Sequence, residues 1–307
     1  MKKVIVTTTI NPPTDAIRKF DAMPDWHLVV AGDRKTPEYR LERGTYLSPE
    51  DQEKYDPLLS EAIGWNSIQR RNFAFLCAHD MHADIIALVD DDNIPFEEWG
   101  QNLLIGREVE VNYYETDLDA FDPVGATNHP ALWHRGYPLQ LIPRRDYSRR
   151  TRRTVTPHVQ ADFWNGDPDI DAICRLEHAP ECKFDDSYFP MAASKPGPFN
   201  SQNTFLDARC LKDYMVFPHI GRMDDIWPSY YFQARGYQVV WNKASVYQAR
   251  NEHDLVRDMQ QEFIGYENNL NLVRSLSRDP ESITRYIPGR TAWAFSLYRR
   301  HFDCSKK

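Results

Sequence analysis

The sequence predicts a single-domain α/β protein with a mostly parallel central sheet, flanking helices and a ligand site at the carboxyl ends of the strands. Three observations lead to this prediction. Runs rich in Val and Ile alternate with helical segments over the first 90 residues, as in parallel β-α-β units. Of the 307 residues, 41% are hydrophobic, which suffices for a substantial core. Three consecutive aspartates, Asp90, Asp91 and Asp92, follow the apolar run at residues 85–89.

The first half of the chain reads as strands separated by helices. Residues 4–9 form a β-branched run that ends at an Asn-Pro-Pro turn, and residues 26–31 form a second run that ends at Gly32-Asp33. A short helix is expected between them. Ser48 is the expected N-cap of a further helix, followed by Pro49 and an acidic first turn, with Leu58, Leu59, Ala62 and Ile63 on its apolar face. Residues 67–79 predict another helix, which leads into the strand at 85–89.

The aspartate triplet is the strongest indication of chemistry in the chain. Adjacent carboxylates raise one another's pKa and oppose folding unless a cation, a hydroxyl or backbone N–H groups neutralise them. A hard divalent ion with oxygen ligands fits this need. The alternative is a solvated turn in which an aspartate caps the backbone.

Composition excludes several classes of partner. The net charge of −8 opposes binding to nucleic acid and to anionic membranes, and no stretch of 18 apolar residues indicates a membrane span. The chain starts with a strand-like segment rather than the apolar core of a signal peptide, so a cytoplasmic protein is expected. Five cysteines without paired CxxC spacing favour reduced thiols over a disulfide framework or a zinc knuckle.

One segment has the opposite charge. Six arginines lie between Pro143 and Thr154, and they predict either a phosphate-binding cluster, with pyrophosphate the expected ligand, or a solvated loop. They are Arg144, Arg145, Arg149, Arg150, Arg152 and Arg153. Neither a GxGxxG nor a GxxxxGK[ST] pattern occurs, so a nucleotide would have to be held by a metal-bridged diphosphate.

Four segments, in matching order, resemble the reversibly glycosylated polypeptide family, the flavin-free UDP-arabinopyranose mutases, which belong to the GT-A type of nucleotide-sugar enzymes. They cover most of residues 85–230. The segments are Val89-Asp90-Asp91-Asp92, Arg135-Gly136-Tyr137-Pro138, Pro198-Phe199 with Asn203 and Phe205-Leu206-Asp207, and Gly221-Arg222-Met223-Asp224-Asp225-Ile226-Trp227.

The resemblance implies a GT-A-like domain at residues 1–250, with residues 251–307 as a helical extension packed on it. It also implies a metal and a nucleotide site. Asp90 and Asp92 match an Asp-x-Asp motif that binds Mn²⁺ or Mg²⁺, and His253 is a candidate third ligand because the family's histidine aligns near Gln248. The positions that match nucleotide-binding or sugar-binding positions are Thr9, Asn11, Asp33, Arg71, Asp91 and Asn203.

The implied catalytic residues are Arg135, Asp224 and Asp225. The arginine that matches Arg135 in the family is reported to carry a transferred sugar, but guanidinium is a poor nucleophile, so we expect Arg135 to grip the departing pyrophosphate. Asp224 and Asp225, expected at a helix start, would orient sugar hydroxyls or act as a base. The sequence departs from the family at Ile142, where a second arginine is expected.

The resemblance predicts a metal-dependent mutase that needs no flavin and interconverts the pyranose and furanose forms of a UDP- or GDP-linked sugar. Two alternatives remain: a GT-A glycosyltransferase that uses the same donor, and a catalytically silent sugar-nucleotide-binding subunit. The stripe formed by Leu255, Met259, Phe263 and Tyr266 predicts a helix face buried in the core. The aromatic tail at residues 287–307 would either cover the core or mediate homo-oligomerisation.

Overall fold

The computed structural model describes residues 1–249 and 254–303. The strands are β1 (Lys3–Thr8), β2 (His27–Ala31), β3 (Thr45–Leu47), β4 (Ile85–Val89), β5 (Asn93–Pro95), β6 (Val109–Tyr114), β7 (Arg150–Val155), β8 (Val159–Gly166), β9 (Met191–Ala193), β10 (Asn203–Asp207) and β11 (Val239–Gln248). The α-helices are α1 (Asp15–Asp21), α2 (Pro49–Tyr55), α3 (Pro57–Ile63), α4 (Arg71–Asp80), α5 (Ala172–His178), α6 (Ile226–Ala234), α7 (Leu255–Leu276) and α8 (Gly289–Asp303). The 3-10 helices are η1 (Ile68–Arg70), η2 (Leu139–Arg144), η3 (Asp186–Tyr188), η4 (Ala208–Asp213), η5 (Gly221–Met223) and η6 (Pro280–Arg285).

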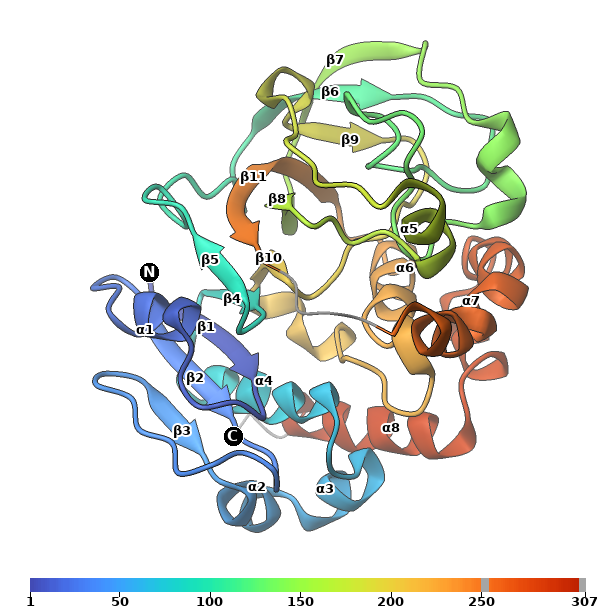
Figure 1. Ribbon diagram of the computed structural model, residues 1–307. Helices are drawn as coiled ribbons and strands as arrows, with labels where there is room; N and C mark the ends of the chain where they lie inside the picture. Colours follow the sequence, from blue (N-terminus) through green and yellow to red (C-terminus); the bar gives the residue numbers. More distant parts are fainter. Residues whose placement is uncertain (250–253, 304–307) are drawn as a thin grey trace.

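One sheet of eleven strands runs through the molecule (Figure 1). Its order is β3-β2-β1-β4-β10-β8-β11-β9-β6-β7, and β5 pairs with β11. The first four strands of this order are parallel, as the sequence predicts. The pairings of β10, β5 and β7, and the pairing between β9 and β11, are antiparallel. The predicted α/β class, with a large central sheet flanked by helices, is therefore confirmed, and the sheet is mixed.

Strand direction decides which side chains can meet. Strand β10 is antiparallel to both β4 and β8, so β8 runs in the same direction as β4, and β11 is parallel to β8. The carboxyl ends of β1, β2, β4, β8 and β11 therefore lie at one edge of the sheet, where β10 begins. This edge carries the aspartate triplet, the residues after β8 and the last residue of β11, Gln248.

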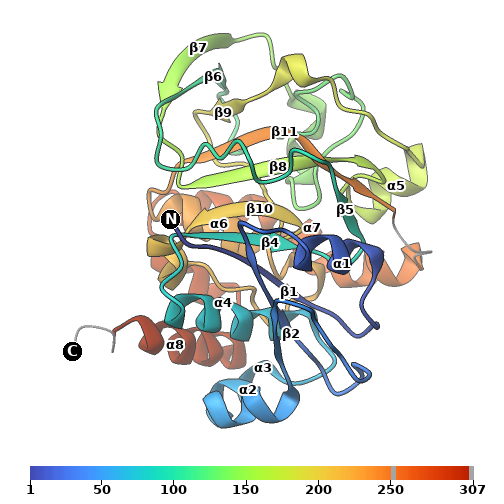
Figure 2. The ribbon, with the colours of Figure 1, turned by 90° about the vertical axis from the view of Figure 1, so that its left-hand side faces the viewer.

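Helices cover the sheet and fix its edge. Helix α4 packs on β1 and β2, and α8 packs on α3. In Figure 2, α4 and α8 lie together on the same side of β4 and β10. The predicted helix over residues 67–79 is present, but its first turn is η1 and the regular helix α4 starts at Arg71.

The helix predicted to start after Ser48 is divided in two. Ser48 Oγ accepts the N–H of Asp51 at 3.1 Å and Asp51 Oδ2 accepts the N–H of Ser48 at 3.0 Å, which forms the capping box of α2. The helix ends at Tyr55 because Asp56 precedes a proline and is extended, and Asp56 then caps α3. Leu58, expected on the apolar face, is half exposed as a result of this break.

The predicted apolar stripe of α7 is wrong. Phe263 is 56% exposed, and the side chains of α7 that are buried include Glu262 and Asn269. Glu262 is buried because its carboxylate accepts hydrogen bonds from Arg222 Nε at 2.8 Å and from the N–H of Ala172 at 2.8 Å. Asn269 accepts a hydrogen bond from the indole of Trp227 at 2.8 Å. Hydrogen-bond partners therefore account for the buried polar residues of this helix, and Leu272, Val273 and Leu276 supply its buried apolar face.

The arginine-rich segment, predicted as a phosphate-binding cluster or a solvated loop, is partly a strand. Residues 150–155 form β7, an exposed strand at the edge of the sheet that pairs with β6. Arg149 pairs with Asp117 at 2.8 Å and Arg152 with Glu110 at 3.2 Å, and Arg153 pairs with Glu115. Arg145 lies apart from the strand, in a largely buried ion pair with Asp122 at 2.6 Å. The cluster therefore neutralises carboxylates of its own surroundings.

Two findings on composition apply to the described residues. No helix there is both long and apolar enough to cross a membrane. The four cysteines in this part of the chain, Cys77, Cys174, Cys182 and Cys210, form no disulfide.

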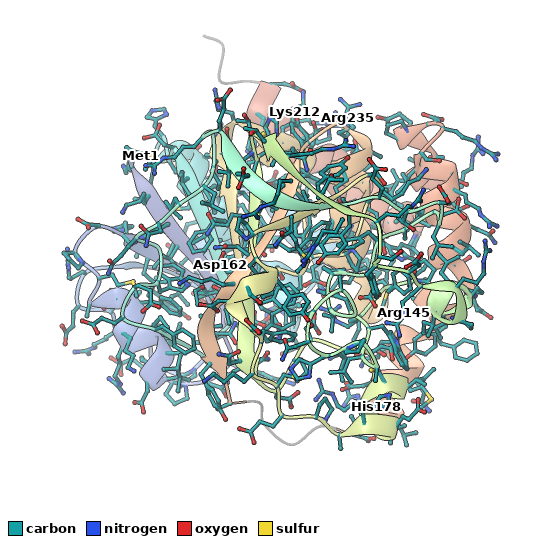
Figure 3. The ribbon with its side chains drawn as sticks, turned by 90° about the horizontal axis from the view of Figure 1, so that it is seen from above. Met1, Arg145, Asp162, His178, Lys212 and Arg235 are labelled. Atoms are coloured by element: carbon teal, nitrogen blue, oxygen red, sulfur yellow. The ribbon has the colours of Figure 1, made fainter. Side chains whose placement is uncertain are left out.

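A buried carboxylate in the sheet makes stability depend on pH. Asp162 on β8 is 6% exposed and lies near the centre of the molecule in Figure 3. Burial raises the pKa of Asp162 to about 6 from its ordinary value of 3.8, although hydrogen bonds from Gln160 and Asn242 oppose the shift. The folded state thus holds this proton more tightly than the unfolded state does. Stability from this group is complete below pH 3.8 and is lost as the pH rises through about 6.

Replacement of this aspartate by Asn should remove that dependence. We expect the free energy of unfolding of Asp162→Asn, relative to the wild type, to increase by about 2 to 3 kcal/mol between acidic and neutral pH, since one pKa unit is about 1.4 kcal/mol. Urea unfolding of both proteins at matched pH values measures the difference. A difference that stays constant with pH would contradict the burial argument.

Candidate functional site

A cavity of about 510 Å³ opens at the sheet edge where the strand ends converge. Its lining is strongly acidic, with five carboxylates and two guanidinium groups. These charged residues are Asp90, Asp92, Asp169, Asp224, Asp225, Arg135 and Arg222. Neutral polar side chains, including Gln69, Ser201, Gln202 and Gln248, complete the wall. The structure thus brings the predicted Asp-x-Asp motif and the predicted catalytic residues to one cavity.

Asp90 is positioned by a buried arginine. Arg71, at the start of α4, is 1% exposed and donates to Asp90 Oδ1 and to Ser201 Oγ, the latter at 2.7 Å. Burial alone would lower the pKa of Arg71, but Asp90 raises it above its ordinary value, so the guanidinium stays charged. Arg71 does not line the cavity. The structure therefore places Arg71 behind the acidic motif, where it orients Asp90, and its predicted role in nucleotide binding stays a prediction.

The middle aspartate points away from the cavity. Asp91 Oδ2 accepts hydrogen bonds from Thr9 Oγ1 and from Asn11 Nδ2, the latter at 3.0 Å, and the carbonyl oxygen of Asp91 accepts the hydroxyl of Thr14 at 2.5 Å. Asp91, Thr9 and Asn11 were predicted to bind the nucleotide, but in the structure they bind one another. These hydrogen bonds hold the loop after β1 against the loop after β4. Asp91 thus has a structural role, whereas Asp90 and Asp92 face the cavity.

Two other predicted binding residues lie outside this cavity. Asn203 is 1% exposed in the core, where its side chain bonds to Trp99 Nε1, to the carbonyl oxygen of Phe163 and to Ser245 Oγ, all at 2.9 Å. Asp33 lines a separate cavity of about 570 Å³ that also contains Tyr39 and Tyr46.

Asp33 nevertheless acts on the main cavity through the backbone. Its Oδ2 accepts the N–H of Ser67 at 3.1 Å, and Ser67 lies in the segment 66–69 that lines the main cavity. Gln69 in the same segment donates to Asp224 at 2.7 Å. Asp33 therefore fixes the loop that supplies a hydrogen bond to a candidate catalytic carboxylate.

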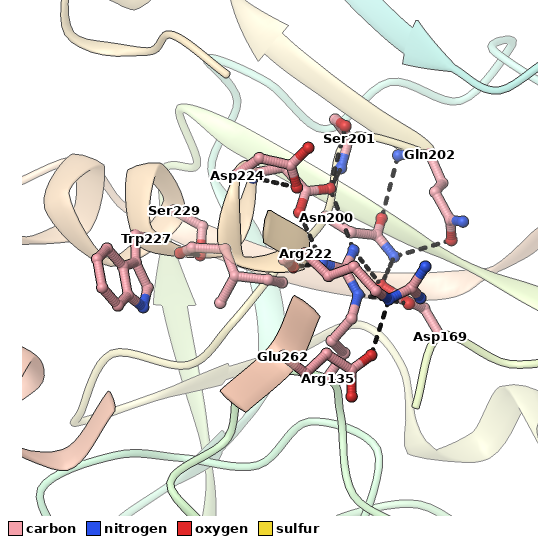
Figure 4. Close-up of polar contacts among 12 residues, drawn as sticks. Arg135, Asp169, Asn200, Ser201, Gln202, Arg222, Asp224, Trp227, Ser229 and Glu262 are labelled. Carbon is pink, nitrogen blue, oxygen red and sulfur yellow. Dashed lines mark hydrogen bonds and ion pairs between the residues drawn. The ribbon is translucent and has the colours of Figure 1, made fainter. Parts of the chain in front are cut away.

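Arg135 is clamped between two carboxylates (Figure 4). Its Nε and Nη2 donate to the two oxygens of Asp169 at 2.8 and 2.9 Å, and its Nη1 and Nη2 donate to the two oxygens of Asp225 at 3.0 and 3.3 Å. Nη1 also donates to the carbonyl oxygen of Arg222. A guanidinium has five N–H donors, and these contacts use all five.

The pairing of Arg135 also fixes its charge. Burial would lower the pKa of Arg135, but Asp169 and Asp225 raise it well above its ordinary value. The sequence predicts that Arg135 grips a pyrophosphate. In this arrangement, however, no N–H of Arg135 is left to do so. The structure instead makes Arg135 the centre of a buried ionic network that holds the wall of the cavity.

Asp224 and Asp225 have different surroundings although they are adjacent. Asp225 accepts hydrogen bonds from the guanidinium of Arg135, and it also accepts the N–H and the hydroxyl of Ser201, at 2.9 and 3.0 Å. Among the described residues, the carboxylate of Asp224 has no arginine donor and accepts hydrogen bonds from the side-chain amide of Gln69 at 2.7 Å and from the N–H of Asp225 at 3.1 Å. Burial, and then repulsion from Asp225, raises the pKa of Asp224 to about 7. A carboxylate with such a pKa can both accept and release a proton near neutral pH.

The segment that starts at Arg135 and the segment that contains Asp224 and Asp225 meet in space, although they are about 90 residues apart in sequence. Gly136 has φ +83°, and a Cβ at this position would lie 2.2 Å from Cγ2 of Ile226, the first residue of α6. Glycine is therefore required for both its backbone conformation and its close approach to the helix. Helix α6 begins directly after Asp225, as predicted for a pair of acids at a helix start.

Asp169 is the main site residue that sequence reasoning missed. It follows β8 in the segment Gly166-Asp167-Pro168-Asp169, and it is completely buried. Two aspartates that follow a strand and a glycine form a pattern similar to the triplet after β4, so the sequence could have indicated Asp169 as a site residue. The third predicted metal ligand, His253, lies outside the described residues.

The donor set fits a hard divalent ion in part. Asp90 and Asp92 supply carboxylate oxygens to the cavity, as Mg²⁺ and Mn²⁺ prefer. Among residues 1–249 and 254–303, no group of three His, Cys, Asp or Glu side chains is arranged to hold a metal ion. A third protein ligand from the described residues would therefore have to be of another type.

Comparison with known proteins gives only a distant likeness. No family model matches the sequence, and no curated protein matches it. Solved structures similar to the chain include glucosyl-3-phosphoglycerate synthase from Mycobacterium tuberculosis in complex with phosphoglyceric acid, with 13% identity, a TM-score of 0.44 and coverage of 88% of this chain and 80% of that chain. A structure of the same synthase with Mn²⁺, UDP-glucose and phosphoglyceric acid shows 11% identity, a TM-score of 0.44 and the same coverage. The mannosyltransferase PcManGT from Pyrobaculum calidifontis, in complex with GDP-mannose and Mn²⁺, shows 11% identity, a TM-score of 0.39 and coverage of 99% and 74%. The structures named here are nucleotide-sugar glycosyltransferases.

Proposed function

We propose that the protein is a divalent-metal-dependent glycosyltransferase of the GT-A type, which transfers a sugar from a UDP- or GDP-linked donor to an acceptor hydroxyl. The observation that carries the proposal is the acidic cavity at the converging strand ends. A diphosphate could not enter a site with five carboxylates and two guanidinium groups unless a cation neutralised the repulsion. The mannosyltransferase and the synthase named above were solved with such donors and Mn²⁺, but the proposal rests on the cavity.

Each part of the cavity has a chemical role in this proposal. Asp90, oriented by Arg71, and Asp92 would hold a Mg²⁺ or Mn²⁺ ion, which when bound neutralises charge on the departing nucleoside diphosphate. Asp224, with its pKa raised to about 7, would take the proton of the attacking hydroxyl. Asp169, Arg135 and Asp225 would keep this wall in place.

A second candidate is the pyranose–furanose mutase reaction, without a flavin. It is favoured by the meeting of the Arg135-Gly136-Tyr137-Pro138 segment with the Asp224-Asp225 segment at the cavity. The role expected for Arg135 in that reaction is not supported, because all five of its N–H donors bind protein oxygens. The mutase is therefore the weaker candidate.

The two reactions differ in what they release. We expect incubation with Mn²⁺, a panel of UDP- and GDP-linked sugars and candidate acceptors to release one nucleoside diphosphate for each sugar transferred, because the donor bond breaks once for each transfer. Chromatography of nucleotides and sugars measures both products. A nucleotide-linked furanose formed without free nucleoside diphosphate would favour the mutase. Tight Mn²⁺-dependent nucleotide binding with neither product would favour a catalytically silent subunit.

A further inference from the structure

We propose that the side-chain amide oxygen of Gln248 is the third protein ligand of the divalent metal ion, so that the metal site has only oxygen donors. This inference rests on the proposed function, because it concerns the ion that Asp90 and Asp92 would hold. It differs from the expectation that a histidine, His253, completes the site.

Gln248 lies close to the acidic motif. Gln248 is the last residue of β11, and it pairs with Asn93, the residue directly after Asp92. Tyr247 is 39% exposed, whereas Gln248 is 2% exposed, so the alternation of the strand directs Gln248 inward. Gln248 lines the same cavity as Asp90 and Asp92. The strand order therefore places the amide side chain of Gln248, on β11, close to the acidic motif that follows β4.

The side chain of Gln248 also has an unsatisfied polar atom. Within the described part of the chain, Gln248 Oε1 is buried and has no hydrogen-bond partner. Burying an amide oxygen without a partner costs about 1 to 3 kcal/mol, so native proteins rarely leave one unmet. A cation in the cavity would satisfy this oxygen. Asn93 Oδ1 is unpaired as well, but Asn93 does not line the cavity, so it is the weaker candidate.

The amide oxygen of Gln248 also has the ligand chemistry that a hard cation prefers. Amide and carboxylate oxygens suit Mg²⁺ and Mn²⁺, whereas imidazole also suits Zn²⁺, Cu²⁺ and Ni²⁺. A glutamine ligand adds no charge, so two carboxylates and one amide leave a divalent ion able to attract a diphosphate. The proposal thus specifies a site for hard cations.

Titration of the protein with Mn²⁺ alone, followed by the electron paramagnetic resonance signal of the free ion, tests the proposal without an activity assay. We expect Gln248→Leu to raise the Kd for Mn²⁺ by at least about tenfold, the scale on which even indirect partners of a metal act. Gln248→Glu should bind Mn²⁺ at least as tightly as the wild type, because it keeps the oxygen and adds a charge. Unchanged affinity in Gln248→Leu would overturn the proposal.

A matched control separates metal binding from loss of stability. Gln160 is also 2% exposed, but its Nε2 donates to Asp162 and its Oε1 accepts the N–H of Leu104, and it does not line the cavity. Gln160→Leu should therefore lower stability and leave the affinity for Mn²⁺ unchanged. Equal weakening by both variants would show that the effect of Gln248 is only structural, and it would overturn the proposal.

Pulsed electron paramagnetic resonance identifies the donor atom directly. Mn²⁺ bound to the wild type should show no coupling to a directly bonded ¹⁴N nucleus, whereas Mn²⁺ bound to Gln248→His should show it. A nitrogen coupling in the wild type that is lost in His253→Ala would overturn the inference and return the third ligand to histidine.

The Asp92→Ala variant separates this inference from the function. If Asp92→Ala abolishes Mn²⁺ binding but Gln248→Leu does not weaken it, only the inference falls. If the wild type binds no Mn²⁺, the proposed metal-dependent function falls with it.

Discussion

Replacing Asp224 by Asn should lower sugar turnover by about 10²- to 10⁴-fold, the usual contribution of a general base, while the affinity for Mn²⁺ stays the same. Asparagine keeps an oxygen that can accept the hydrogen bond from Gln69, so the wall of the cavity is preserved. It cannot take a proton from an acceptor hydroxyl. The rate of nucleoside diphosphate release from the donor, measured beside the Mn²⁺ titration, separates these two properties.

The role of Asp224 as a base also predicts how turnover depends on pH. A general base works only when it is deprotonated, so wild-type turnover should rise with pH through the pKa of Asp224, which burial and Asp225 raise to about 7. The residual activity of Asp224→Asn should lack this rise. Asp213→Asn provides a control, because Asp213 is also buried but lies outside the cavity, and its variant should keep the rise. A rise that persists in Asp224→Asn would assign the base to another residue.

The second large effect is on stability. Replacing Arg135 by Met should lower the free energy of unfolding by about 3 to 5 kcal/mol, because it leaves the buried carboxylates of Asp169 and Asp225 without their counterion. Methionine has a similar length and no charge, so packing is largely kept. Urea unfolding at neutral pH measures the loss.

Two comparisons show whether the charge network is the cause. Arg149→Met breaks an exposed ion pair with Asp117, which solvent screens, and it should cost much less stability than Arg135→Met. Adding Asp169→Asn and Asp225→Asn to Arg135→Met should recover part of the lost stability, because the uncompensated charges are then gone. If Arg135→Met costs no more than Arg149→Met, the clamp does not hold the cavity wall.

Much of the N-terminal half could be predicted because its signals are local. Strands β1, β2 and β4 are apolar runs that end at polar turns, and Ser48 with Asp51 forms a capping box within four residues. The same applies to the acidic motif, since it lies at the end of a strand whose apolar character is evident. For these elements sequence neighbours supply most of the interactions that decide the structure.

The remaining features depend on contacts between distant segments. Strand β7 carries arginines in place of an alternating apolar pattern. It is a strand because β6 offers a hydrogen-bond ladder, and because Glu110 on β6 and Glu115 directly after it pair with two of the arginines. The roles of Arg71 and Arg135 could not be read from their motifs, because Ser201 and Asp169 are distant in sequence. Gln248 reaches the acidic motif only because β11 runs parallel to β8 in this sheet order.

The outer edge formed by β7 also governs how copies of the chain meet. The arginines Arg150, Arg152 and Arg153 outnumber the carboxylates that pair with two of them, so a second molecule that extended the sheet by antiparallel pairing would still bring like charges together. Like charges on neighbouring strands repel, so the edge disfavours pairing between β7 strands of two molecules at low ionic strength. Dissolved salt screens that repulsion, and a concentrated solution of the protein should become less resistant to fibrous association as salt is added.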